Sequence, residues 1–137
     1  MPMLRAAAPE GTLFTGFLRD EQLAEVYASS DLFFTPSSTE TFGNVALEAM
    51  ASGLPVIAAN AGGFRNVIHH GVDGLLSAPR DAHGFALALE SLLLQPERAR
   101  AMGQNAMQTA ARHSWDAIFN QLMEDYEQAV EKRRMAS

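Results

Sequence analysis

The chain has 137 residues, of which 47% are hydrophobic and 19% charged, a composition typical of a globular domain and not of a disordered chain. Its 10 basic and 16 acidic residues give a formal net charge of −6, which argues against a non-specific nucleic-acid surface, because such a surface requires a basic field. The chain contains no cysteine, so disulfides, thiolate catalysis and cysteine metal sites are excluded.

The length suits one compact domain, and no apolar run is long enough to span a bilayer. The first residues lack the apolar core of a signal peptide, so we expect a cytoplasmic protein. Residues 1–11 show no apolar period and are expected to be poorly structured, whereas residues 12–137 form the domain. An α/β domain usually opens on a strand with its own crossover, which this start lacks, so we expect a fragment or a short product of a longer chain.

The first half of the chain alternates between strand and helix signals. Apolar, β-favouring runs predict about four strands, at residues 12–15, 31–36, 55–59 and 74–77. Apolar positions at helical spacing predict helices between them, at residues 21–29, 42–52 and 64–70. This alternation predicts an α/β fold with a parallel sheet and right-handed crossovers.

After Pro79 the pattern indicates helices only. Asp81 caps the first of them, Pro96 begins the second, and Ser114 caps the third. We interpret one face of the third helix as core packing, and it carries Trp115, Ile118, Phe119, Leu122 and Tyr126.

The loops that follow the predicted strands, at residues 16–19, 36–43 and 60–65, are expected to meet on one rim, because ligands of such a sheet bind beyond the carboxyl ends of its strands. A helix start near Gly43 would offer unpaired N–H groups and a positive dipole end there, which suit a phosphate. Glu40 and Glu48 flank this helix start, and their carboxylates can accept hydrogen bonds from sugar hydroxyls. Pyrophosphate between two sugars is the chemistry of a sugar nucleotide.

Each of these features also has a structural interpretation. Glu48 either binds a ligand, caps a loop N–H or is solvated. Gly43 either admits a ligand to the backbone or eases a turn, and the same holds for Gly62 and Gly63. Arg19 either meets a nucleotide or is solvated. The sequence contains no dinucleotide or P-loop fingerprint, no serine-hydrolase elbow and no metal-ligand spacing.

Several segments stand in a characteristic order, among them F-T-G-F-L, D-L-F-F-T-P-S, E-T-F-G-N-V-A-L-E-A-M-A-S-G-L-P-V-I-A, A-G-G-F-R-N-V-I and G-V-D-G-L-L. Together, over Phe14 to Tyr126, they resemble the carboxyl-terminal domain of retaining glycosyltransferases of the GT-B fold, in the large family four. The resemblance implies a Rossmann-like parallel sheet flanked by helices, partial because the opening strands are absent, with a helical carboxyl-terminal region.

The resemblance also implies roles for individual residues. Glu40 matches the first glutamate of the E-x7-E motif, which contacts the transferred sugar and is the candidate catalytic residue. Glu48 matches the second glutamate, which holds the ribose hydroxyls. The backbone between them would meet the sugar at Thr41, Phe42 and Gly43 and the diphosphate at Asn44 and Val45.

Further positions follow from the same resemblance. Phe17 and Leu18 would line the base pocket, with Arg19 as an additional candidate. Gly62 and Gly63 match a loop near the interdomain cleft. No metal or other cofactor is required if the helix start and basic groups supply the positive charge.

The implied activity is transfer of a hexosyl group from a UDP- or GDP-sugar to an acceptor sugar or lipid, which an amino-terminal domain would bind. The basic residues that grip the diphosphate belong to family strands that this chain lacks, so the isolated chain is expected to be inactive or nearly so. Its exposed sheet edge is expected to favour self-association. A non-catalytic sugar-nucleotide-binding module and a GT-B-fold epimerase remain alternatives. The nucleotide base, sugar, acceptor and any membrane association stay open.

Overall fold

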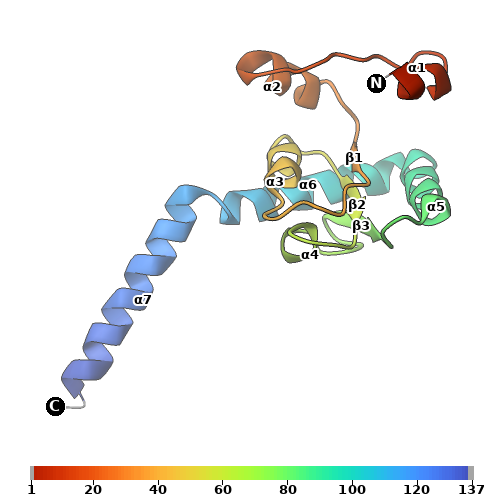
Figure 1. Cartoon of the computed structure of the whole chain (residues 1–137). Coiled ribbons are helices and arrows are strands. Elements are labelled where there is room, and N and C mark those ends of the chain that lie inside the picture. The colour runs from red at the N-terminus through yellow and green to blue at the C-terminus, as the bar shows by residue number, and fades with distance from the viewer. Residues whose placement is uncertain (1, 136–137) are drawn as a thin grey trace.

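The structure is a computed structural model, and it describes residues 2–135. Figure 1 shows a small central sheet covered by helices, with α1 (Pro2–Ala7) and α2 (Asp20–Ala28) beside it and α7 (Trp115–Met135) leading away from it. The sheet contains β1 (Phe33–Thr35), β2 (Val56–Ala59) and β3 (Gly74–Ser77), all parallel and in the order β1-β2-β3. The predicted α/β fold with a parallel sheet is therefore confirmed.

The central strand β2 is buried along its whole length, and its two faces enter separate clusters. Val56 and Ala58 pack against α3 (Asn44–Ala51) and α4 (Phe64–Val67). Ile57 and Ala59 pack against α5 (Ala82–Leu93), and α6 (Pro96–Arg112) contributes to both clusters. Helices thus cover both faces of the sheet, as expected for parallel strands that are apolar on both sides.

Two helices are shorter than predicted, because non-helical backbone angles delay the start of one and end the other early. Helix α3 begins at Asn44, since Gly43 before it has a φ of 81° in the left-handed region. Helix α4 ends at Val67, since Ile68 has extended backbone angles. Both differences lie at the ends of the helices, and the elements themselves are where the sequence predicts them.

The strand predicted at residues 12–15 does not form, so the described sheet has three strands and not about four. Leu13 is 87% exposed. Within the described chain no strand lies beside residues 12–15 to pair with them, and β1 pairs with β2 alone. Within residues 1–11, where we expected little structure, Pro2–Ala7 form helix α1, and residues 4–7 of this helix are exposed.

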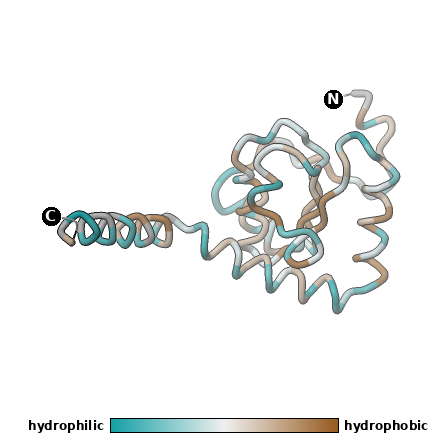
Figure 2. Tube along the Cα trace, turned by 90° about the horizontal axis from the view of Figure 1, so that it is seen from below, coloured by the Kyte–Doolittle hydropathy of each residue, from teal (hydrophilic) through white to brown (hydrophobic). Residues whose placement is uncertain are grey.

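Helix α7 does not bury the apolar face that the sequence indicates. It projects from the rest of the chain, with hydrophilic and hydrophobic turns alternating along it (Figure 2). Its residues Ile118, Phe119 and Leu122 are exposed, so the core-packing interpretation is wrong for them. The side chains of Trp115 and Tyr126 lie outside the described part. Within residues 2–135, no helix combines the length and the hydropathy needed to cross a membrane.

Candidate functional site

Two loops meet at the carboxyl edge of the sheet, one leading from β1 to α3 and one from β2 to α4. Gly63 donates its N–H to the carbonyl oxygen of Glu40 at 2.8 Å. A Cβ atom on Gly62 would overlap that same oxygen, and one on Gly63 would lie 2.5 Å from the nitrogen of Gly43. The glycine pair therefore lets the two backbones touch. The sequence alone left open what Gly62 and Gly63 admit, and in this structure it is the neighbouring loop.

Glu40 is half-buried, and its carboxylate is held in place. Its Oε1 accepts the N–H of Gly43 at 3.0 Å, which closes a turn immediately before α3. Within residues 2–135, its second oxygen, Oε2, has no hydrogen-bond donor. The side chain thus stabilises the helix start while one of its oxygens stays available to a ligand at the rim.

The first turn of α3 leaves backbone donors unpaired. The N–H groups of Ala46 and Leu47 both donate to the carbonyl of Gly43 at 3.0 Å. Those of Asn44 and Val45 have no acceptor within the part of the chain that the structure describes, and both residues are exposed. Two free donors at the positive end of a helix dipole suit an anion.

Glu48 has a partner that the sequence did not indicate. The hydroxyl of Tyr27, on α2, donates to its Oε2 at 3.3 Å. The half-buried Tyr27 ring packs against Phe33 with centroids 5.9 Å apart. Burial, and after it the charge of Glu48, raises the pKa of the Tyr27 phenol above 10.0. The sequence analysis missed this contact; a tyrosine on an otherwise apolar helix face was the signal, because a buried Tyr hydroxyl usually finds a partner.

The residues predicted for the base pocket lie apart from the helix start. Phe17 is 81% exposed, and the Arg19 guanidinium lies 4.9 Å from its ring centroid. Leu18 shares a hollow of about 260 Å³ with Tyr27, at the beginning of β1. No hydrogen bond or ion pair joins residues 17–19 to residues 40–48 in the described chain. Loop 16–19 therefore makes no direct polar contact with the start of α3, and Tyr27, which lines a hollow with Leu18, contacts Glu48 through its hydroxyl.

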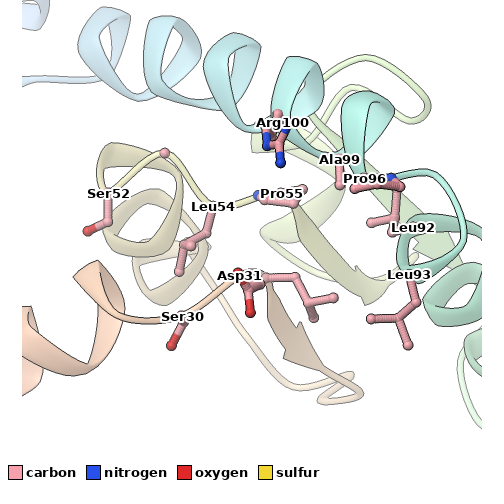
Figure 3. A pocket seen from close by; sticks show the side chains of 12 residues that line it. Ser30, Asp31, Ser52, Leu54, Pro55, Leu92, Leu93, Pro96, Ala99 and Arg100 are labelled. Atoms are coloured by element: carbon pink, nitrogen blue, oxygen red, sulfur yellow. The ribbon is translucent and has the colours of Figure 1, made fainter.

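A further hollow, of about 380 Å³, lies at the opposite edge of the sheet (Figure 3). It is bounded by Asp31 before β1, Pro55 before β2, Leu92 on α5 and Arg100 on α6. These positions lie at the amino ends of the strands, away from the loops that hold Glu40. Ligands of parallel sheets bind at the carboxyl ends, so this hollow is not the candidate site. Among residues 2–135, no group of three or more His, Asp or Glu side chains is placed to hold a metal ion.

The chain is similar to known proteins in sequence and in structure. The model of a family described as "Glycosyl transferases group 1" matches residues 3–109. A D-inositol 3-phosphate glycosyltransferase from Thermobispora bispora is 42% identical over 111 residues, which cover 81% of this chain and 26% of that protein. The chain therefore spans about a quarter of the length of the curated relatives that it matches.

Two solved structures extend the likeness to three dimensions. Sucrose-phosphate synthase from Thermosynechococcus elongatus matches 96% of this chain with a TM-score of 0.81 and 34% identity, over 33% of its own chain. Anabaena Alr3699/HepE, in complex with UDP-glucose, matches 77% of this chain with a TM-score of 0.64 and 30% identity, over 29% of its own chain.

Proposed function

Because the chain belongs to the family of glycosyl transferases group 1, we propose that it is the donor-binding, carboxyl-terminal part of a retaining glycosyltransferase that uses a nucleotide-sugar. The start of α3 carries the proposal. There, the free N–H groups of Asn44 and Val45 lie in the chain between the carboxylates of Glu40 and Glu48. The two N–H groups can bind a diphosphate, and the carboxylate on each side can accept hydrogen bonds from the hydroxyls of a sugar. A nucleotide-sugar has this order, with a diphosphate between two sugars.

The transferred sugar lies at Glu40 in this proposal. Its Oε1 is engaged by Gly43, so Oε2 is the oxygen that accepts a sugar hydroxyl. The backbone of Thr41, Phe42 and Gly43 adjoins the same sugar. Because the Gly43 bond fixes the carboxylate before ligand arrives, less side-chain freedom is lost on binding.

The chemistry follows from where charge develops. As the nucleoside diphosphate leaves, the bond between the sugar C1 and the β-phosphate oxygen breaks, and its electron pair passes to the phosphate. The hydroxyl oxygen of the acceptor forms the new bond to C1, and the proton of that hydroxyl passes to the departing phosphate. N–H groups aimed at that phosphate bind the transition state more strongly than the ground state, which lowers the barrier. The sugar becomes oxocarbenium-like, and the negative charge of Glu40 stabilises it.

The nucleoside lies on the other side of the diphosphate. Glu48 accepts the ribose hydroxyls, and Phe17, Leu18 and Arg19 are proposed for the base. The resemblance supports this order, and in the structure the Tyr27 hydroxyl contacts Glu48. The UDP-glucose complex of Anabaena Alr3699/HepE supports UDP as the nucleotide to test first.

Calorimetric titration tests these assignments. Wild-type chain, Glu40→Gln, Glu48→Gln and the control Glu90→Gln, an exposed position on α5, are titrated with UDP and with UDP-glucose. Glu48→Gln should weaken both ligands by about tenfold or more, since a hydrogen bond to a charged group is lost. Glu40→Gln should weaken UDP-glucose only. Equal binding by all four proteins, or no binding of UDP at millimolar concentration, would contradict the proposal.

The whole activity requires more than this chain, because the resemblance places the acceptor site on another domain. We expect the isolated chain to transfer little or no sugar. D-inositol 3-phosphate, which names the matched relative, is the acceptor to test with UDP-glucose. Sustained multiple turnover by the isolated chain would show that this division of the site is wrong.

A further inference from the structure

Glu48 lies on an exposed part of α3, and its carboxylate is contacted by a residue of another helix, α2. Glu48 is exposed, and an exposed glutamate side chain that has no partner samples several rotamers. A ligand that binds one of these rotamers must restrict the side chain at an entropic cost. Within residues 2–135, the hydroxyl of Tyr27 is its one side-chain partner. The position of the Glu48 carboxylate, and with it any ligand contact that the carboxylate makes, therefore depends on the position of Tyr27.

Tyr27 is itself fixed by its surroundings. Its ring packs against Phe33 and against the buried cluster on the α3 face of the sheet. The end of α2 is closed by two hydroxyls, with Ser29 Oγ donating to the Glu25 carbonyl at 2.8 Å and Ser30 Oγ to the Val26 carbonyl at 2.6 Å. A tyrosine side chain has only two χ angles, so packing of its ring also fixes the position of its hydroxyl oxygen.

We propose that Tyr27 is a positioning residue that holds Glu48 toward the ribose of the bound nucleotide, an inference that rests on the proposed donor site. A carboxylate offers about four lone-pair sites. Tyr27 takes one of them on Oε2, which leaves acceptors on both oxygens for the two ribose hydroxyls. Tyr27 therefore does not compete with ribose. The bond of 3.3 Å is long for two oxygens, and such contacts often shorten when the ligand is bound.

The charge state of the pair agrees with this role. Burial and the Glu48 charge both raise the pKa of the phenol, so Tyr27 stays protonated at neutral pH. It can then donate its proton to the carboxylate without adding a charge beside it.

The contact is tested first without ligand. The chain has two tyrosines, so a Tyr126→Phe background leaves the absorbance of Tyr27 alone to be titrated. In that background Glu48→Gln should lower the pKa of the phenol toward 10.0, and Glu90→Gln should leave it unchanged. A phenol that titrates identically with and without Glu48→Gln overturns the inference.

Positioning is tested by binding. Tyr27→Phe keeps the ring and removes the hydroxyl, and it should weaken UDP about threefold to tenfold. It should leave unchanged the affinity for a UDP analogue that lacks both ribose hydroxyls, and it should add nothing in a Glu48→Gln background. Equal losses for UDP and the analogue would indicate a purely structural role and overturn the inference.

The UDP-binding measurements distinguish a failure of the positioning role from a failure of the proposed donor site. UDP binding that does not depend on Glu48 would refute the proposed donor site. UDP binding that depends on Glu48 but is untouched by Tyr27→Phe would refute only the positioning role. Tyr126→Phe, the same chemical change on α7, is the matched control and should bind UDP as the wild-type chain does.

Discussion

The carbonyl oxygen of Glu40 accepts the N–H of Gly63 at 2.8 Å, and this bond joins the loop after β1 to the loop after β2. The same residue, Glu40, uses its side chain to hold Gly43 before α3. One glutamate thereby fixes both the contact between the loops and the start of the helix. The geometry of the proposed donor site depends on this joint.

Gly63→Ala should break that joint. Gly63 has helical backbone angles, so alanine costs nothing in φ, but its methyl group would overlap the backbone of Phe42 and Gly43. We expect a loss of about 1–3 kcal/mol of stability from overpacking, together with loss of UDP binding. Chemical denaturation and calorimetry measure the two effects.

Gly71→Ala is the contrasting variant. A Cβ there meets nothing within 4 Å, although the φ of 81° makes alanine strained. Gly71→Ala should lower the free energy of unfolding by about 1–2 kcal/mol, because of backbone strain alone, and leave UDP binding intact. Loss of binding in both variants, or in neither, would show that the packing of the two loops does not control the site.

Asp73 anchors the turn before β3 to α6. It is fully buried; its Oδ1 accepts the N–H of His69 at 2.7 Å, and its Oδ2 lies 2.7 Å from His69 Nδ1 and accepts Thr109 Oγ1 at 2.8 Å. Asp73→Asn should lower the free energy of unfolding by about 2–4 kcal/mol, because an amide cannot satisfy all three donors. Asp31→Asn, at an exposed position, should change it by less than about 0.5 kcal/mol. Similar effects of the two variants would contradict this account.

The stability of the chain should fall at high pH through Tyr27. Its pKa is raised in the folded state, so the folded chain holds the phenolic proton more tightly than the unfolded chain. The stabilisation that Tyr27 gives to the folded chain is complete below pH 10.0 and is lost as pH rises through the folded pKa. Over that range the free energy of unfolding falls by at most about 1.4 kcal/mol per pH unit. Urea denaturation at rising pH should show a smaller decline in Tyr27→Phe than in Tyr126→Phe. Parallel declines would contradict the raised pKa.

The free edge of β1 should make the isolated chain self-associate. β1 is an edge strand of the described sheet, and Phe34 on it is 42% exposed. Exposed edges pair with other chains unless charges oppose it. Sedimentation velocity should show a mass that rises with concentration, which Phe34→Lys reduces and Phe42→Lys, on the rim loop, does not. A monomer at every concentration would refute this expectation.

Local patterns in the sequence were enough to predict most of the fold. The apolar run bounded by Pro55 and Asn60 became β2, and the helix between Glu40 and the Gly53 turn became α3. The strand at residues 12–15 could not be predicted correctly from its own residues, because a strand exists only where another strand pairs with it. The exposure of α7 is a similar case, since amphipathic spacing states which face prefers burial and not whether a partner is present.

The site was predictable only in part. Glu40, Glu48 and the helix start between them were predicted from residue type and spacing, and the structure forms that helix one residue after Gly43. The contact of Tyr27 with Glu48 joins residues 21 positions apart, and the loop contact at Gly63 joins two backbones; neither follows from a local period. Such contacts depend on how α2 and the two loops pack.

The most direct test of the donor site is an amide NMR titration of the isolated chain with UDP and with GDP. The account predicts that one nucleotide shifts the backbone amides of residues 40–48, with Asn44 and Val45 shifting most because their N–H groups meet the diphosphate. Shifts confined to the hollow at the opposite edge of the sheet, or no shifts at millimolar nucleotide, would contradict a donor site at the start of α3.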